Sequence, residues 1–199
     1  GMPAEIDPDQ FASIADMFEK TAAKFADKPA YHNLGHTIGY GELERLSRQF
    51  AAFLQGLPGM AKGDRVVLYM PLVPELAIAM LACTRIGAIH SIIFGGFSAD
   101  SVRDRINDAQ CTVLITADGG YRRGSVLPLK RFADEAIAGC PSIHNVIVVQ
   151  RRPGGAGDES VANMTEGRDH WWHRLLDRES PICAPEPMEA EDMLFILYT

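Results

Sequence analysis

The sequence predicts an α/β fold, with an open and mostly parallel sheet and helices on both faces. Short apolar runs of strand length recur between positions 63 and 150, and the segments between them have the apolar spacing of helices. Glycine, proline and aspartate mark most boundaries between these segments. Strands that alternate with helices form parallel sheets with right-handed crossovers.

Residues 1–62 are predicted to form a helix–hairpin–helix segment. Phe11, Ile14 and Phe18 begin an amphipathic pattern, and the turn residues at 33–36 separate two short strands. In order, the expected elements are a helix over 9–26, strands over 30–34 and 37–40, and a helix over 42–54.

Residues 63–150 are predicted to form the parallel α/β core. Pro74 suits the first turn of a helix, Gly87 suits a helix C-terminus, and Ser98 suits an N-cap. The strands are expected over 65–70, 90–94, 112–116 and 145–149, and the helices over 75–86, 98–108 and 126–138.

Residues 151–199 depart from this alternation. Glycines and a proline predict a surface loop over 151–158, and two tryptophans lie in a short helix expected over 168–176. Three prolines favour an extended connector over 180–191. The stretch 193–199 reads as a closing strand with a hydroxyl residue at its end, where many α/β proteins place a phosphate-binding loop.

Composition limits the possible functions. A length of 199 residues suits one domain or one and a half, and a net charge of −7 argues against a nucleic-acid partner. The four cysteines are widely spaced, which predicts reduced thiols and no zinc site. The N-terminal residues are acidic and polar and do not form a signal peptide, and no apolar run approaches the ~20 residues of a membrane span, so a cytoplasmic protein is expected.

A glycine pair follows the strand predicted at 90–94. In Phe94-Gly95-Gly96-Phe97 the missing side chains would let a ligand approach the backbone, next to the N–H groups at the start of a helix. This favours a contact with an anion or a nucleotide. The alternative is a tight turn that needs glycine for its own conformation.

A second glycine-rich turn, 118–124, follows the strand at 112–116. It carries Arg122 and Arg123, and two guanidinium groups between glycines suit the capture of a phosphate. The alternative is a solvated basic turn. Because both turns follow parallel strands, we expect them at the same edge of the sheet, where they can share a ligand.

The histidines and serines do not predict a catalytic centre. His90 begins a strand and is interpreted as a core histidine, while His170 and His173 lie beside two tryptophans whose packing explains the local pattern. The serines lack a G-x-S-x-G context. We therefore assign neither a catalytic residue nor a metal ligand from the sequence.

Several stretches together resemble acetyl-CoA synthetases and related short-chain acyl-CoA synthetases, which belong to the AMP-forming adenylating superfamily. The resemblance covers roughly 63–199, and Glu166–Trp172 fits the same group. The stretches that carry it are Tyr69–Ser91, Phe94–Phe97, Ile115–Asp118, Pro128–Lys130 and Phe195–Thr199. It implies the N-terminal subdomain of an adenylating ligase, which joins a carboxylate to CoA through an acyl-adenylate made from ATP with Mg²⁺.

The resemblance also implies site residues. Phe94, Gly95, Gly96 and Arg122 match family positions near the CoA nucleotide, and Thr199 matches the first hydroxyl of the loop that holds the ATP phosphates. Family members often carry a second basic residue three positions after Arg122. Here that position is Ser125, and Arg123 is an additional arginine.

Residues 1–62 look more like long-chain fatty-acyl-CoA ligases, which suggests a hybrid of two ligases with a seam near 62–66. The rest of the phosphate loop, the carboxylate pocket and the C-terminal domain with the family's catalytic lysine lie beyond Thr199. We therefore expect no turnover and no stably bound cofactor for this chain alone. The alternative is a non-catalytic α/β module that binds a nucleotide or a protein. An uncovered apolar surface predicts self-association.

Overall fold

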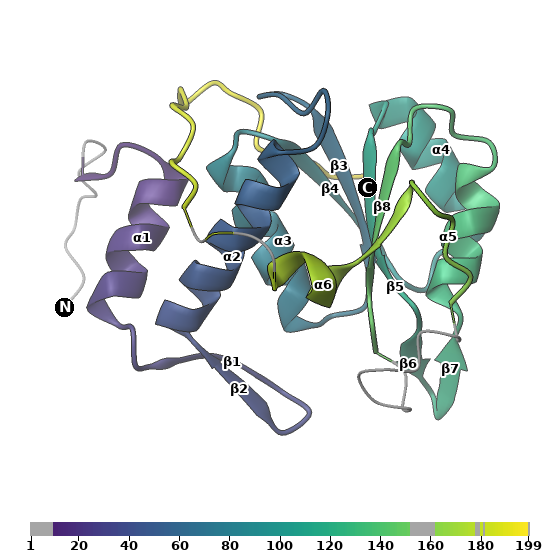
Figure 1. Ribbon diagram of the computed structural model, residues 1–199, viewed down its shortest axis with the longest axis horizontal. Coiled ribbons are helices and arrows are strands. Elements are labelled where there is room, and N and C mark those ends of the chain that lie inside the picture. Colours follow the sequence, from purple (N-terminus) through teal and green to yellow (C-terminus); the bar gives the residue numbers. More distant parts are fainter. Residues whose placement is uncertain (1–9, 152–161, 178–179, 181, 199) are drawn as a thin grey trace.

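A six-stranded parallel sheet runs through the centre of the molecule (Figure 1). The computed structural model describes residues 10–151, 162–177, 180 and 182–198. Neighbouring strands pair in the order β10-β4-β3-β5-β8-β9, and each pair is parallel. The strands are β3 (Arg65–Met70), β4 (Ile89–Phe94), β5 (Val113–Ala117), β8 (Asn145–Val149), β9 (Asp169–Trp171) and β10 (Phe195–Ile196). The predicted fold class is confirmed.

Helices cover both faces of the sheet. Figure 1 shows α1, α2, α3 and α6 on one side and α4 and α5 on the other. Their bounds are α1 (Ile14–Lys24), α2 (Tyr40–Gln55), α3 (Pro74–Arg85), α4 (Ala99–Ala109), α5 (Leu129–Ile137) and α6 (Trp172–Leu176).

Local signals explain where several helices begin. The side chain of Ser98 accepts a hydrogen bond from the backbone N–H of Ser101, as an N-cap does, and Pro74 occupies the first turn of α3. The predicted cap of the first helix differs. Ser13, rather than Asp9, caps α1 by accepting from the N–H of Asp16, and Asp9 lies outside the described residues.

Two antiparallel hairpins lie outside the central sheet. The predicted N-terminal hairpin is present as β1 (Pro29–Asn33) and β2 (His36–Gly39). The second hairpin, β6 (Gly120–Arg122) and β7 (Ser125–Leu127), lies where the sequence predicts a turn and the start of a helix. Arg123 and Gly124 both have positive φ, which makes a tight two-residue turn and lets the strands pair before α5 begins.

Two further expectations near the C-terminus are corrected. The segment predicted as a helix over 168–176 is the strand β9 followed by α6, because Val146, Ile147 and Val148 of β8 offer an open edge for pairing. The predicted closing strand over 193–199 is shorter, since only Phe195 and Ile196 pair with β4. The loop predicted at 151–158 lies, from 152 onward, outside the described residues.

One hydrophobic core includes side chains from all three predicted segments. Strands β3, β5 and β8 are almost completely buried, as expected for strands covered on both faces. The ring of Trp172 lies 3.9 Å, centroid to centroid, from that of Phe50 in α2, so α6 is attached to the core through aromatic packing.

Two buried cations connect distant elements. Arg85 of α3 is almost fully buried and pairs with Glu19 at 2.7 Å and with Glu44 at 3.1 Å, which joins α1, α2 and α3. Lys130 of α5 is also buried and pairs with Asp134 at 2.7 Å and with Asp169 of β9 at 2.8 Å. Charges buried in this way stay favourable only while their partners are present.

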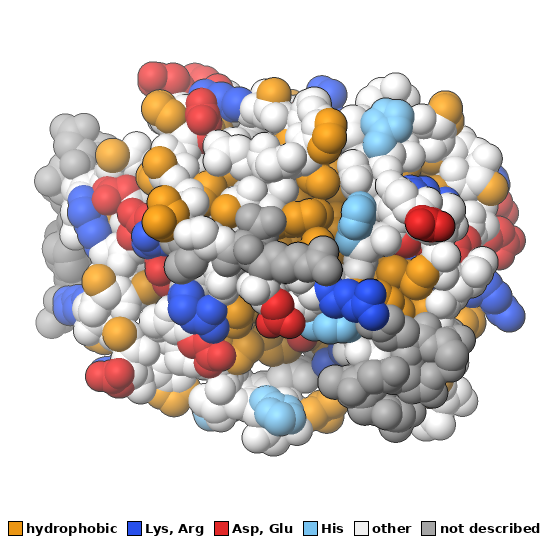
Figure 2. All heavy atoms as spheres, in the orientation of Figure 1, with side chains coloured by type: hydrophobic (Ala, Val, Ile, Leu, Met, Phe, Trp, Pro, Cys, Tyr) orange, Lys and Arg blue, Asp and Glu red, His pale blue; other side chains and the backbone are white. Residues whose placement is uncertain are grey.

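Acidic and basic side chains are mixed on the visible surface (Figure 2). On the face shown in Figure 2, acidic and basic side chains lie close together, especially over the end of the molecule that carries α1. In the part of the chain that the structure describes, no helix is both long and apolar enough to cross a membrane. All four cysteines are buried and free of disulfides.

Candidate functional site

The two glycine-rich turns meet at the carboxyl edge of the sheet. Strand β4 ends at Phe94 and β5 ends at Ala117, and these strands flank β3 on either side, so both turns emerge at the same end. Between them lies a cavity of about 520 Å³, hereafter the turn cavity. It is lined by Asn33, Leu34, Pro71, Leu72, Val73, Phe94, Gly95, Gly96, Gly120, Tyr121, Arg122, Leu127, Leu129 and Arg151.

Phe94 and Arg122 form a partly exposed pair at this cavity. The guanidinium carbon of Arg122 lies 5.7 Å from the centroid of the Phe94 ring, within cation–π range. The ring remains 50% exposed, so a flat face and a positive charge are both accessible from solvent. In the described part of the chain, no carboxylate forms an ion pair with Arg122.

Gly96 is the glycine on which this geometry depends. A Cβ atom at position 96 would lie 2.5 Å from Nη1 of Arg122 and 2.7 Å from Cε1 of Phe94, so either side chain would have to move. At Gly95 the nearest atoms would lie 3.4 Å from such a Cβ, which is ordinary contact. Gly96 therefore permits the close approach of Arg122 and Phe94, a role that the sequence alone does not distinguish from a simple turn requirement.

The structure separates the two predicted arginines. Arg122 lines the turn cavity, whereas Arg123 lies exposed at the tip of the β6–β7 hairpin with φ of 50° and does not line the cavity. Ser125 is paired with Arg122 across the hairpin. Thr199 lies outside the described residues, while its neighbour Tyr198 donates a hydrogen bond to the carboxylate of Asp108 at 2.6 Å.

Most of the residues that line the turn cavity were not predicted from the sequence, and Arg151, Leu34 and Leu72 are examples. Arg151, which follows β8, lines the cavity, and its backbone N–H donates to the buried carboxylate of Asp118 at 2.8 Å. Leu34 and Leu72 come from the first hairpin and from the β3–α3 connection. The sequence predicts that these residues follow strands or lie in turns, but only the fold shows that these connections line the same cavity.

The described lining of the turn cavity suits the binding of a ligand. It holds two arginines and several apolar side chains, and among the described residues it includes no serine, threonine, cysteine, histidine or carboxylate. In the described residues, no group of three His, Cys, Asp or Glu side chains could hold a metal ion. A flat ring with an attached anionic group fits this chemistry.

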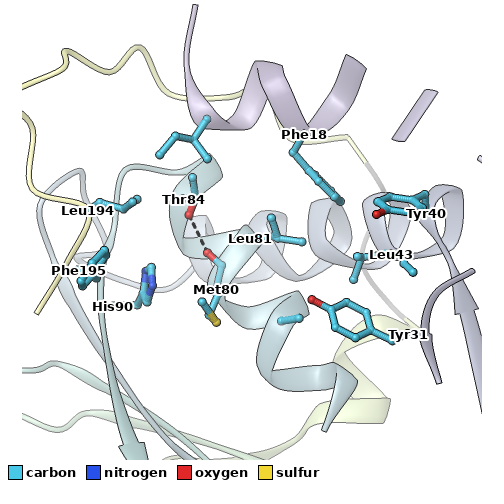
Figure 3. A pocket seen from close by; sticks show the side chains of 13 residues that line it. Phe18, Tyr31, Tyr40, Leu43, Met80, Leu81, Thr84, His90, Leu194 and Phe195 are labelled. Atoms are coloured by element: carbon cyan, nitrogen blue, oxygen red, sulfur yellow. Dashed lines mark hydrogen bonds between the residues drawn. The ribbon is translucent and has the colours of Figure 1, made fainter. Parts of the chain in front are cut away.

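A second cavity, of about 450 Å³, lies between α1, the first hairpin, α2, α3 and strands β4 and β10 (Figure 3). Its lining is mostly aromatic and aliphatic, with side chains such as Phe18, Tyr31, Tyr40 and Phe195. His90 faces it as the main ionisable group, and its Nδ1 atom is buried without a hydrogen-bond partner. The interpretation of His90 as a core histidine is confirmed, since it is 4% exposed.

Acidification is expected to weaken the fold through His90. Burial lowers the pKa of His90 from 6.5 to about 4, so the folded chain keeps this ring neutral while the unfolded chain protonates it below pH 6.5. Its stabilising contribution is therefore complete above pH 6.5 and is lost as the pH falls towards 4, by at most ~3 kcal/mol. Urea unfolding from pH 7 to pH 5 measures this loss.

The matched variant for that measurement is His90→Gln, which removes the titrating group. Its free energy of unfolding is expected to fall less between pH 6.5 and pH 5 than that of the wild type. Carboxylates titrate in both proteins, so the difference between the two curves reports His90. Parallel curves would contradict the assignment.

The fold and the turn cavity define a class of protein, and comparison with known families agrees. Residues 18–199 match the model of the family described as AMP-binding enzyme, and the chain belongs to that family. Among curated proteins it is 58% identical over 163 residues to an acetyl-coenzyme A synthetase of Gemmatimonas aurantiaca, a match that covers 82% of this chain and 25% of the relative.

Two further comparisons agree. An acetyl-coenzyme A synthetase of Syntrophus aciditrophicus is 50% identical over 173 residues, which is 87% of this chain and 25% of the relative. The structure of acetoacetyl-CoA synthetase from Streptomyces lividans superposes with a TM-score of 0.79 at 25% identity, covering 94% of this chain and 28% of that one. The chain is thus a homologue of acetyl-CoA synthetases and spans about a quarter of their length.

The similarity to acetyl-CoA synthetases crosses the predicted seam. Residues 63–199 number 137 of the 199, so a match over 163 residues includes at least 26 of the residues before Gly63. The family model also runs through positions 62–66 without a break. The greater likeness of residues 1–62 to long-chain ligases stays a prediction.

Proposed function

We propose that this chain is the N-terminal part of an AMP-forming acyl-CoA synthetase and carries part of its CoA site. The complete enzyme would activate acetate or a similar short carboxylate with ATP and Mg²⁺, and then transfer the acyl group to CoA. When bound, CoA supplies the thiol that accepts the acyl group. The residues of this chain bind and orient its nucleotide portion.

The observation that carries this proposal is the close approach at Gly96. The absence of a side chain there lets the guanidinium of Arg122 and the ring of Phe94 lie in cation–π range, and both groups stay open to solvent. A guanidinium beside an exposed ring can hold a phosphate and a nucleobase at the same time. Gly95, Tyr121 and Arg151 complete the surroundings that a nucleotide would contact.

Titration calorimetry with CoA and with pantetheine tests the proposal. Heat of binding is expected for CoA up to millimolar concentrations, and none is expected for pantetheine, which lacks the nucleotide. The site is incomplete, so weak affinity is expected. Absence of heat with CoA, or equal heat with both compounds, would contradict a nucleotide site on this chain.

The ATP site is proposed on the resemblance at Phe195–Thr199, with Thr199 as the first hydroxyl of the phosphate loop. Most of the length of its relatives lies outside this chain, so we expect the chain alone to show no ATP–pyrophosphate exchange. An exchange rate above that of a blank would show that these residues suffice for adenylation.

A second candidate function is association with another polypeptide through the C-terminal residues. Met193, Phe195 and Leu197 are 53%, 51% and 68% exposed, and β10 lies at the edge of the sheet. Exposed apolar residues on an edge strand favour pairing with a further strand. Sedimentation velocity is expected to show self-association, and a monomer at high concentration would contradict it.

A further inference from the structure

Four large apolar side chains are exposed around the turn cavity. Leu34 and Leu72 are each 76% exposed, and Phe94 and Tyr121 are 50% and 51% exposed. They come from four separate segments: the first hairpin, the β3–α3 connection, the end of β4 and strand β6. Gathering of exposed apolar groups at one cavity marks a binding surface, since single exposed residues are common but clusters are not.

Leu34 is unfavourable for folding in two respects. It occupies the turn between β1 and β2 with φ of 46°, followed by Gly35 with φ of 85°. Asparagine, aspartate and glycine are preferred at such left-handed turn positions, and a leucine is unfavourable there because its Cβ crowds the backbone. Its side chain recovers little of this cost by burial, because 76% of it is exposed.

The fold places this costly residue at the candidate site. Both hairpins project from the same end of the sheet (Figure 1), and Leu34 lines the turn cavity together with Arg122. A residue that is strained and exposed, yet positioned at a cavity, indicates a role in binding rather than in folding.

We propose that Leu34 is a ligand-contacting residue, which packs with Leu72 against the purine base of a nucleotide whose phosphate is held by Arg122. The inference rests on the proposed CoA site. It adds a contact surface from the N-terminal hairpin to that site. A purine presents a flat, weakly polar face, and an exposed leucine pair provides apolar surface that such a face buries. The cavity, at about 520 Å³, lies within the usual range for small-ligand sites.

Leu34→Asn tests the inference because it separates folding from binding. Asparagine relieves the turn, so the midpoint of thermal unfolding is expected to stay unchanged or to rise. The affinity for CoA is expected to fall roughly three- to tenfold, because the contact with the base is lost. Adenosine 3′,5′-bisphosphate, which shares the base and lacks the pantetheine arm, is expected to weaken by the same factor.

The matched control is Ile182→Asn. Ile182 is 81% exposed and does not line the turn cavity, so this change alters a similar apolar surface elsewhere. CoA affinity is expected to remain at the wild-type value in this variant.

The possible outcomes distinguish the inference from the proposed function. Equal CoA affinity in Leu34→Asn and the wild type would overturn the role of Leu34 and leave the CoA site standing. If the wild type itself binds no CoA, both fall. If Leu34→Asn changes only the sedimentation coefficient, the apolar cluster is a contact between copies, and the assignment to a base is wrong.

Discussion

Replacing Asp169 by alanine is expected to lower the free energy of unfolding by about 2–3 kcal/mol, the range for lost hydrogen bonds to a charged group. The Asp169 side chain is fully buried and accepts from Lys130 at 2.8 Å, from Nε of Arg168 at 2.5 Å and from the backbone of Thr165 at 2.9 Å. Without it, buried Lys130 keeps Asp134 as its carboxylate partner but loses the contact that joins α5 to β9.

The lowered pKa of Asp169 shows that its ionised form stabilises the folded chain. Burial by itself would raise that pKa, but hydrogen bonds from Arg168 and Lys130 outweigh burial and hold it below 3.8. The stabilisation is therefore present above the ordinary carboxyl pKa and disappears as the pH falls through the lowered value. Urea unfolding at pH 7 measures the effect without this complication.

Lys20→Ala is the control for Asp169→Ala. Lys20 forms an ion pair of similar length, 2.7 Å, with Asp16, but its side chain is 58% exposed. Exposed pairs of this kind contribute little, so this variant is expected to unfold almost as the wild type does. A loss below ~1 kcal/mol for Asp169→Ala would show that the buried network adds little to stability.

Replacing Arg122 by alanine is expected to weaken CoA binding by at least tenfold, because it removes a positive charge and the partner of the Phe94 ring together. Arg122→Lys keeps the charge but loses the planar group, so an intermediate affinity is expected. Calorimetric titration of each variant with CoA measures the change, and circular dichroism checks that the fold is retained.

Arg123→Ala is the matched control because it removes the same charge from the neighbouring residue. Arg123 lies at the exposed hairpin tip and does not line the turn cavity. Its removal is expected to leave CoA affinity nearly unchanged. If both alanine variants lose CoA affinity equally, general electrostatic attraction accounts for CoA binding, and the position of Arg122 beside Phe94 does not.

Prediction from sequence succeeded where a pattern was local. Strands β3 and β8 have the predicted bounds, and the Ser98 cap and Pro74 are where their chemistry required. It failed where pairing decided the structure. Strand β9 and the short β10 depend on partners far along the chain, which periodicity does not reveal. The β6–β7 hairpin is local, but its three-residue strands are too short to show a periodic pattern.

The candidate site shows the same division. Phe94, Gly95, Gly96 and Arg122 were singled out because two glycine-rich turns follow parallel strands, and the fold brings these four residues to one cavity. Arg123 was indistinguishable from Arg122 by residue type, and only the hairpin geometry shows that Arg123 does not line the turn cavity. Leu34 carried no signal, because a leucine beside a turn glycine is expected to be structural.

The sequence by itself therefore determined the α/β class, the bounds of strands β3 and β8, and the sheet edge at which the two glycine-rich turns lie, since these follow from short-range periodicity and turn chemistry. Three features were decided by the tertiary structure alone. Arg122 is the arginine that lies beside Phe94, a side chain at position 96 would displace this pair, and the N-terminal hairpin reaches the turn cavity. Those features depend on distances between segments separated by many residues, which strand order and crossover geometry set.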